Sequence, residues 1–176
     1  MKKALFLDRD GIINVDHGYV SKIEDFEFVE GIFDLVKIFT NKGYLIFVVT
    51  NQSGIGREYY SEEDFQKLTA WMKDEFKKNS IEITQVYHCP HSPDAECSCR
   101  KPKIGMIEEA LKTYSIDLPA SWMIGDKQSD MDLAKNAGLG HTIYIGHDKI
   151  QNSSYNFGSI FDCKSYLEKN QDIIPL

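Results

Sequence analysis

The chain has 176 residues, of which 42% are hydrophobic and 27% are charged, and its formal net charge is −7; this composition is typical of one folded globular domain and excludes fibrous and disordered classes. The acidic balance argues against broad association with nucleic acid, which depends on lysine and arginine neutralising phosphates. The apolar runs are too short to cross a bilayer and the first residues lack the apolar segment of a secretory signal, so we expect a cytoplasmic monomer that contacts neither nucleic acid nor membrane.

Short apolar segments rich in β-branched and aromatic residues alternate with segments of helical periodicity. In chain order, the pattern predicts a strand at 3–7, a helix at 31–42, a strand at 44–50, a helix at 61–79, a strand at 83–88, a helix at 104–114, a strand at 121–125, a helix at 130–137, a strand at 141–146 and a helix near 163–170. Ser61 and Asp64 are spaced as in a capping box. The alternation predicts an α/β fold with a doubly wound, mostly parallel sheet in a single domain over 1–176, onto which the tail 147–176 packs.

Polar residues follow each of the first four predicted strands. Asp8 and Asp10 follow the first strand, Thr50 and Asn51 the second, Arg100 and Lys101 the loop after the third, and Asp126 the fourth. Each pattern alone is typical of an ordinary turn. Because ligands of such sheets gather at the carboxyl ends of the strands, the four together predict one shared site.

The chemistry of these residues favours phosphoryl transfer assisted by a metal ion. The carboxylates of Asp8, Asp10 and Asp126 offer the hard oxygen ligands that Mg²⁺ prefers. A carboxylate can also act as a nucleophile and form an aspartyl-phosphate. Thr50 and Lys101 are suited to stabilise the equatorial phosphoryl oxygens, and Asp10 to transfer protons.

A cysteine-rich loop at 88–101 predicts a structural zinc site. Its ligands follow the spacing C-x-H-x5-C-x-C, from Cys89, His91, Cys97 and Cys99. His88 is a competing ligand, although it fits the end of a strand better, and Cys163 is expected to be a buried small apolar residue. The metal would hold Arg100 and Lys101 toward the strand ends, because both directly follow the last ligand.

Four stretches, "LFLDRDG", "VVTNQSG", "CRKP" and "IGDKQSD", resemble the four motifs of the haloacid dehalogenase (HAD) superfamily of phosphohydrolases. Within it, "DRDGIINVDHGYV", "FEFVEG", "TNQSGIGR", "LTAWM" and the cysteine loop are similar to the D-glycero-D-manno-heptose 1,7-bisphosphate 7-phosphatase family. The likeness covers residues 4–146. It implies a capless Rossmann-like HAD fold and a Mg²⁺-dependent enzyme that removes the 7-phosphate through an aspartyl-phosphate, in nucleotide-activated heptose synthesis for surface glycans.

The resemblance also implies roles for individual residues. Asp8 would be the nucleophile and Asp10 the general acid and base, with Thr50 and Lys101 stabilising the phosphoryl group. Asp8, Asp126 and the backbone carbonyl of Asp10 would bind Mg²⁺. Substrate would contact a further set of residues, namely Asp16, His17, Gly18, Tyr19, Asn51, Gln52, Ser53, Arg100 and Lys127.

Two departures keep alternatives open. Ile12 stands where the superfamily usually has threonine, which removes a hydroxyl beside the turn but no group assigned to the chemistry, so we expect activity to survive it. Only five residues separate His91 from Cys97, a spacing closer to the related histidinol phosphatases, so histidinol phosphate is an alternative substrate. Alternatives from other classes are a receiver-like signalling domain and a zinc-stabilised binding module without catalysis.

Overall fold

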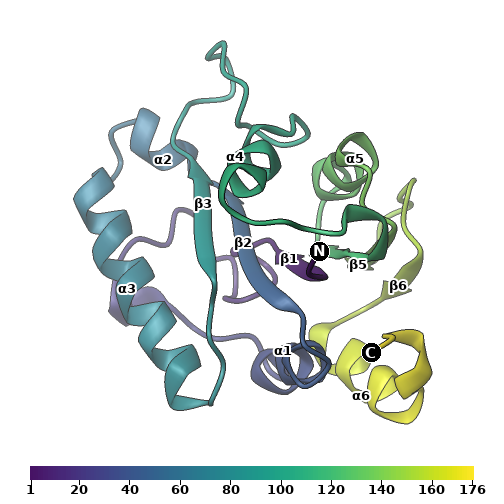
Figure 1. Ribbon diagram of the computed structural model, residues 1–176. Helices are drawn as coiled ribbons and strands as arrows, with labels where there is room; N and C mark the ends of the chain where they lie inside the picture. Colours follow the sequence, from purple (N-terminus) through teal and green to yellow (C-terminus); the bar gives the residue numbers. More distant parts are fainter.

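A six-stranded parallel sheet forms the centre of the molecule. The computed structural model describes residues 1–176, and Figure 1 shows the arrangement of its elements. The strands pair in the order β3-β2-β1-β4-β5-β6, and every pair is parallel. Their bounds are Ala4–Leu7 for β1, Leu45–Asn51 for β2, Gln85–Cys89 for β3, Trp122–Gly125 for β4, His141–Ile145 for β5 and Tyr155–Phe157 for β6. The doubly wound α/β fold is thereby confirmed.

Helices cover both faces of the sheet. They are α1 (Ile32–Thr40), α2 (Ser53–Gly56), α3 (Glu62–Lys78), α4 (Gly105–Thr113), α5 (Gln128–Ala137) and α6 (Ile160–Lys169), with short 3₁₀ turns at Ile23–Asp25, Leu118–Ala120 and Gln171–Ile173. The helices α1, α3 and α6 pack on one face of the sheet, and α4 and α5 pack on the other (Figure 1). One apolar core lies between the sheet and the helices on each face. The fully buried strand β1 supplies both cores, because side chains alternate along a strand: Leu5 and Leu7 enter one core, Ala4 and Phe6 the other.

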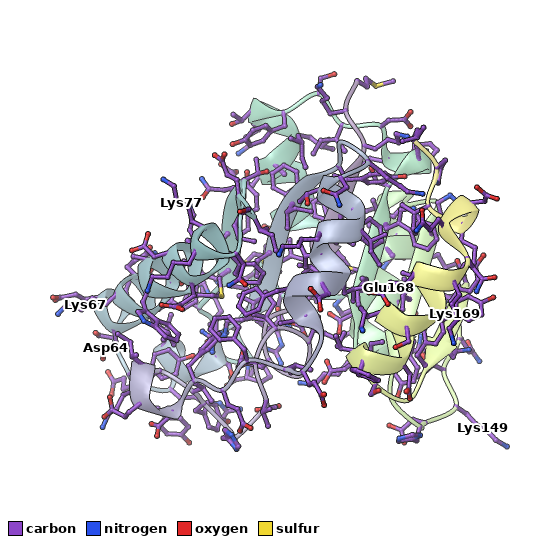
Figure 2. The ribbon with its side chains drawn as sticks, turned by 90° about the horizontal axis from the view of Figure 1, so that it is seen from below. Asp64, Lys67, Lys77, Lys149, Glu168 and Lys169 are labelled. Atoms are coloured by element: carbon purple, nitrogen blue, oxygen red, sulfur yellow. The ribbon has the colours of Figure 1, made fainter.

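Charged side chains mark the outer faces of the covering helices. Figure 2 shows Asp64, Lys67 and Lys77 on α3 pointing outward from the molecule, and the exposed residues Glu168 and Lys169 lie at the end of α6. None of the helices combines the length and the apolar character that crossing a bilayer requires.

The predicted elements agree with the structure except near their ends and in short segments. The capping box of α3 is present, since Ser61 Oγ accepts from the Asp64 N–H and the Asp64 carboxylate accepts from the Ser61 N–H. The helix α5 begins two residues earlier than expected, at Gln128. The sequence did not predict the one-turn helix α2 or the edge strand β6, because four and three residues are too few to show a period.

The sheet order defines where a ligand can bind. From β1, the chain continues to β2 and β3 on one side, and then crosses to β4, β5 and β6 on the other. At such a reversal of strand order, a crevice opens outside the carboxyl ends of the neighbouring strands. The segment 8–31 between β1 and α1 contains only isolated bridges and one 3₁₀ turn, so it forms a loop rather than a cap domain.

Candidate active site

The carboxyl ends of β1, β2 and β4 bring the predicted polar residues together. Asp8 directly follows β1, Thr50 lies at the end of β2, and Asp126 directly follows β4. Lys101 reaches the same place from the loop after β3, although 93 residues separate it from Asp8. The expected convergence on one edge of the sheet is therefore present.

Lys101 lies between two buried carboxylates. Its Nζ is 2.9 Å from Asp8 Oδ1 and 2.7 Å from Asp130 Oδ1, and it also donates to the carbonyl oxygen of Val49 at 2.9 Å. Although burial lowers the pKa of Lys101, the carboxylates of Asp130 and Asp8 raise it above the ordinary value. The ammonium group therefore stays charged at the floor of the site.

Three carboxylates, from Asp8, Asp126 and Asp130, offer oxygen atoms that all lie within 4.8 Å of one another. Burial, together with the charge of Asp130, raises the pKa of Asp8 to about 6. Burial and the charge of Asp8 raise the pKa of Asp126 to about 7, and Asp126 Oδ1 is buried without a hydrogen-bond partner. Crowded acidic oxygens and an unpaired acceptor fit a divalent cation such as Mg²⁺.

Gly11 makes room for this cluster. Its φ of +89° lies in the left-handed region, and a Cβ there would lie 2.1 Å from Asp126 Oδ2. A side chain at this position would therefore strain the backbone and displace the Asp126 carboxylate.

Asp10 is held by three donors, two from its own loop and one from the segment that follows β2. Its Oδ1 accepts from Arg9 Nη2 at 2.9 Å and from Asn14 Nδ2 at 3.0 Å. Its Oδ2 accepts from Gln52 Nε2 at 3.0 Å, and the same Gln52 nitrogen donates to Thr50 Oγ1 at 2.9 Å. The half-buried carboxylate therefore has a fixed orientation at the edge of the cleft.

A polar cleft of about 390 Å³ opens above these groups. Its lining contains three cations, Arg100, Lys101 and Lys127, in a chain whose net charge is negative. Arg100 Nη1 is buried without a hydrogen-bond partner, so this guanidinium group of the lining keeps an unused donor. The complete lining is Asp10, Asp16, Gly18, Tyr19, Asn51, Gln52, Ser53, Tyr60, Arg100, Lys101, Lys127 and Ser129.

The lining contains eight of the nine residues for which the sequence predicts substrate contact. The exception is His17, which lies on a neighbouring hollow with its Nε2 2.9 Å from Glu27 Oε2. Tyr60 and Ser129 line the cleft without having been predicted. His17 is the middle residue of a surface turn, and sequence alone did not show that its ring turns away from the cleft.

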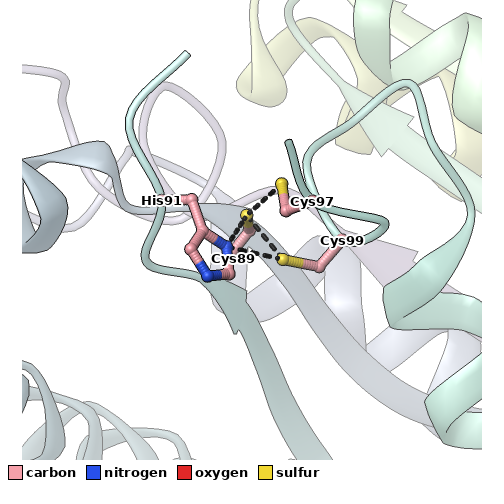
Figure 3. Close-up of side chains that lie close together, drawn as sticks. All are labelled: Cys89, His91, Cys97 and Cys99. Carbon is pink, nitrogen blue, oxygen red and sulfur yellow. Dashed lines mark hydrogen bonds between the residues drawn. The ribbon is translucent and has the colours of Figure 1, made fainter. Parts of the chain in front are cut away.

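The cysteine loop gathers four metal-ligating atoms at one point. Figure 3 shows the side chains of Cys89, His91, Cys97 and Cys99 pointing toward one another. The Cys89 and Cys97 sulfur atoms are 3.7 Å apart, and His91 Nδ1 is 3.2 Å from Cys99 Sγ. All four cysteines of the chain are free, and burial raises the pKa of the Cys89 thiol to about 12. This set of one nitrogen and three sulfur atoms fits a tetrahedral zinc ion with no position left for water.

His88 lies outside this cluster. Its ring stacks on Phe65 with centroids 4.1 Å apart, and its Nε2 is 3.0 Å from Glu62 Oε2. The loop is joined to the cleft on both sides, because Gln52 N donates to the Cys89 carbonyl at 2.8 Å and Lys101 N donates to Asn51 Oδ1 at 3.1 Å.

Comparison with known proteins gives this arrangement a family. The HAD-hydrolase-like family model matches residues 98–154. A D-glycero-alpha-D-manno-heptose-1,7-bisphosphate 7-phosphatase from Campylobacter jejuni is 52% identical over 147 residues, which cover 84% of each chain. The chain belongs to this phosphatase family. The corresponding beta-named enzyme from Helicobacter pylori strain 26695 is 46% identical over 167 residues, covering 94% of each chain.

A solved structure has the fold of this phosphatase. It is a D,D-heptose 1,7-bisphosphate phosphatase from B. bronchiseptica in complex with magnesium and phosphate, with a TM-score of 0.83 and 23% identity. The match covers 96% of this chain and 99% of that chain. Together, the family model and the two relatives above identify the protein as a phosphoric monoester hydrolase of the HAD superfamily, as the resemblance predicted.

The sequence interpretation missed Asp130, the buried partner of Lys101 in this phosphatase. Its Oδ2 accepts from the backbone N–H groups of Asp126 and Lys127, both at 3.2 Å. The signal was present, since Asp130 ends the "IGDKQSD" motif four residues after Asp126. Only the first aspartate of that motif had been assigned a role.

Proposed function

We propose that this phosphatase removes the 7-phosphate of D-glycero-D-manno-heptose 1,7-bisphosphate through an aspartyl-phosphate on Asp8. The observation that carries the proposal is the position of Asp8, which is buried next to the ammonium of Lys101, a residue that lines the cleft together with two further cations. Arg9 N and Lys101 Nζ both donate to Asp8 Oδ1, at 2.8 and 2.9 Å, and so fix the plane of the carboxylate.

In the first step, a carboxylate oxygen of Asp8 attacks phosphorus while the bond from phosphorus to the sugar oxygen breaks. Asp10 donates a proton to that leaving oxygen. Lys101 and the Thr50 hydroxyl stabilise the charge on the transferring phosphoryl group, since both lie at the same strand edge.

In the second step, water attacks the phosphorus of the aspartyl-phosphate. Asp10, now a carboxylate, takes a proton from this water, and the bond between phosphorus and the Asp8 oxygen breaks. Inorganic phosphate leaves, and both aspartates return to their starting forms. Asp130 would keep Lys101 in place throughout, because its buried carboxylate binds the ammonium at 2.7 Å.

Two metal ions complete the proposal. Mg²⁺, held by Asp8, Asp126 and the backbone carbonyl of Asp10, would offset the repulsion between the anionic nucleophile and the anionic phosphate. Zn²⁺ at Cys89, His91, Cys97 and Cys99 would hold the loop that carries Arg100 and Lys101. Thiol ligands remain available in a reducing compartment, so we expect the enzyme to act in the cytoplasm.

The names of the relatives support a heptose bisphosphate as the substrate. Arg100 and Lys127 would contact the phosphate that is not removed, since both cations line the cleft. The product, a heptose that keeps its 1-phosphate, suits activation by a nucleotide for surface glycan synthesis. A receiver domain fits less well, because its sheet has the order 2-1-3-4-5 whereas this sheet has the order 3-2-1-4-5-6.

The test is ³¹P NMR of the magnesium-loaded enzyme with each heptose 1,7-bisphosphate anomer and, separately, with histidinol phosphate. Selective loss of the 7-phosphate signal supports the heptose assignment, and the faster anomer identifies the preferred substrate. Preferential hydrolysis of histidinol phosphate would overturn it and make the short His91-to-Cys97 spacing the better guide.

A further inference from the structure

Tyr60 is a buried residue of the cleft for which neither the chemistry above nor the sequence motifs provide a role. It lies between α2 and α3, directly before the N-cap residue of α3. Its side chain lines the cleft, and its hydroxyl group donates a hydrogen bond to Gln52 Oε1. The residue therefore contacts the layer of side chains behind the reacting groups.

Gln52 connects Tyr60 to the two groups expected to act on the phosphate. The side-chain nitrogen of Gln52 donates to Asp10 Oδ2 at 3.0 Å and to Thr50 Oγ1 at 2.9 Å. Asp10 Oδ2 can accept from the Gln52 nitrogen through a lone pair in both the carboxyl and the carboxylate form, and the amide oxygen then faces Tyr60. A donor at the position of the Tyr60 hydroxyl stabilises that orientation.

The tyrosine is suited to remain such a donor. Burial raises the pKa of Tyr60 to about 12, so the hydroxyl keeps its proton at ordinary pH. The ring is fixed by Gly54 of α2, where an added Cβ would lie 2.2 Å from Tyr60 Cε1. The main chain of Gln52 is fixed as well, because its N–H donates to the Cys89 carbonyl.

We propose that Tyr60 is a positioning residue that locks the Gln52 amide, and that the locked amide aims the Asp10 carboxyl group at the leaving oxygen. Arg9 and Asn14 bind only the other oxygen of Asp10, so Gln52 alone controls Oδ2. The same amide donates to Thr50 Oγ1, whose own proton is directed only to the Asn51 carbonyl at a long 3.5 Å and is thus available to turn to the phosphoryl group. The inference rests on the proposed role of Asp10 in proton transfer.

The test compares two substrates that differ in their need for a general acid. The sugar oxygen of heptose 1,7-bisphosphate must be protonated as it leaves, whereas 4-nitrophenolate leaves without a proton. The constant kcat/KM reports the steps up to the first phosphoryl transfer. In Tyr60→Phe, we expect kcat/KM to fall about tenfold with the heptose substrate and less than about threefold with 4-nitrophenyl phosphate. The tenfold loss is a modest part of what general acid catalysis contributes to the rate.

Tyr44→Phe is the matched control, because it removes the hydroxyl of another buried tyrosine at the opposite end of β2, where that hydroxyl has no partner. It should leave both rates within about twofold of the starting enzyme. An equal loss with both substrates in Tyr60→Phe would overturn the inference, since a merely structural defect does not depend on the leaving group.

A double-mutant cycle tests whether Tyr60 acts through Gln52, and it also serves if Tyr60→Phe alone folds poorly. Gln52→Met removes the amide at similar size, so adding Tyr60→Phe should change kcat/KM less than about twofold; additive losses would overturn the inference. Asp10→Asn separates the two proposals. If Asp10→Asn loses equal activity with both substrates, the proposed role of Asp10 is wrong and the inference about Tyr60 is wrong with it. If Asp10→Asn loses more activity with the heptose substrate but Tyr60→Phe does not, only the inference about Tyr60 is overturned.

Discussion

Replacing Asp130 by asparagine should destabilise the protein more than any surface change of the same kind. Asp130 is fully buried, and each of its oxygens is used: Oδ1 binds Lys101, and Oδ2 accepts from the N–H groups of Asp126 and Lys127. Asparagine has one oxygen instead of two. Its amino group must therefore face either the ammonium of Lys101 or the two backbone N–H groups. In both orientations, one hydrogen-bond donor faces another and no hydrogen bond forms.

The magnitude follows from the loss of a buried ion pair, which costs about 3–5 kcal/mol. Removing the Asp130 charge also relieves its repulsion with Asp8, so we expect a loss near the lower end, about 3 kcal/mol. For a chain of this size, that corresponds to a melting temperature lower by about 6–12 °C.

The assay is thermal unfolding of the zinc-loaded protein without added magnesium. Asp74→Asn on the exposed face of α3 is the control, and it should change the free energy of unfolding by less than about 0.5 kcal/mol. A decrease below about 2 °C in Asp130→Asn would refute the reasoning, because it would mean that Asp8 and the Val49 carbonyl satisfy Lys101 without a second carboxylate.

Four further results are expected. Asp8→Asn should lower phosphate release at least about 10³-fold in a colorimetric assay, and undiminished release would remove Asp8 as the nucleophile. Gly11→Ala should weaken magnesium binding measured by calorimetry, because its Cβ displaces the Asp126 carboxylate; unchanged affinity would contradict this. Removing zinc should lower turnover and disorder the loop in circular dichroism, whereas removing magnesium should abolish turnover with the fold intact; an unchanged rate in verified zinc-free protein would contradict the role of the loop. In metal-free protein, the folded-state pKa of Asp8 is about 6 and that of Asp126 about 7, both above the unfolded value near 4. The folded state therefore binds more protons than the unfolded state, and the free energy of unfolding measured in urea should fall as pH rises from about 4 to 7. A free energy of unfolding that does not change with pH over this range would contradict this.

The fold was predictable because its signals are local and repeated. Each of the first five strands is a short apolar run, and the carboxyl ends of parallel strands meet at one edge, so the sequence alone predicts that Asp8, Thr50 and Asp126 lie together. The zinc ligands were predictable for a similar reason, since four potential ligands, three cysteines and one histidine, lie within eleven residues.

The remaining parts of the site depend on contacts that no local pattern encodes. Tyr60 reaches Gln52 only because the short helix α2 turns the chain back over the cleft. The ring of His17 turns to Glu27, ten residues away, although its neighbours in the same turn line the cleft. Side-chain direction of this kind is decided by tertiary packing and not by spacing along the chain.

The charged residues at the floor of the cleft come together late in folding, so the polypeptide can become active only when folding is nearly complete. Asp8 and Lys101 are 93 residues apart, and Asp130 lies 29 residues beyond Lys101. They meet only after β1 has paired with both β2 and β4, and contacts of such long range are the slow part of folding. A nascent chain or a proteolytic fragment can therefore contain several of the motifs and still have no phosphatase activity. Recovery of activity after dilution from denaturant therefore reports that the sheet is complete.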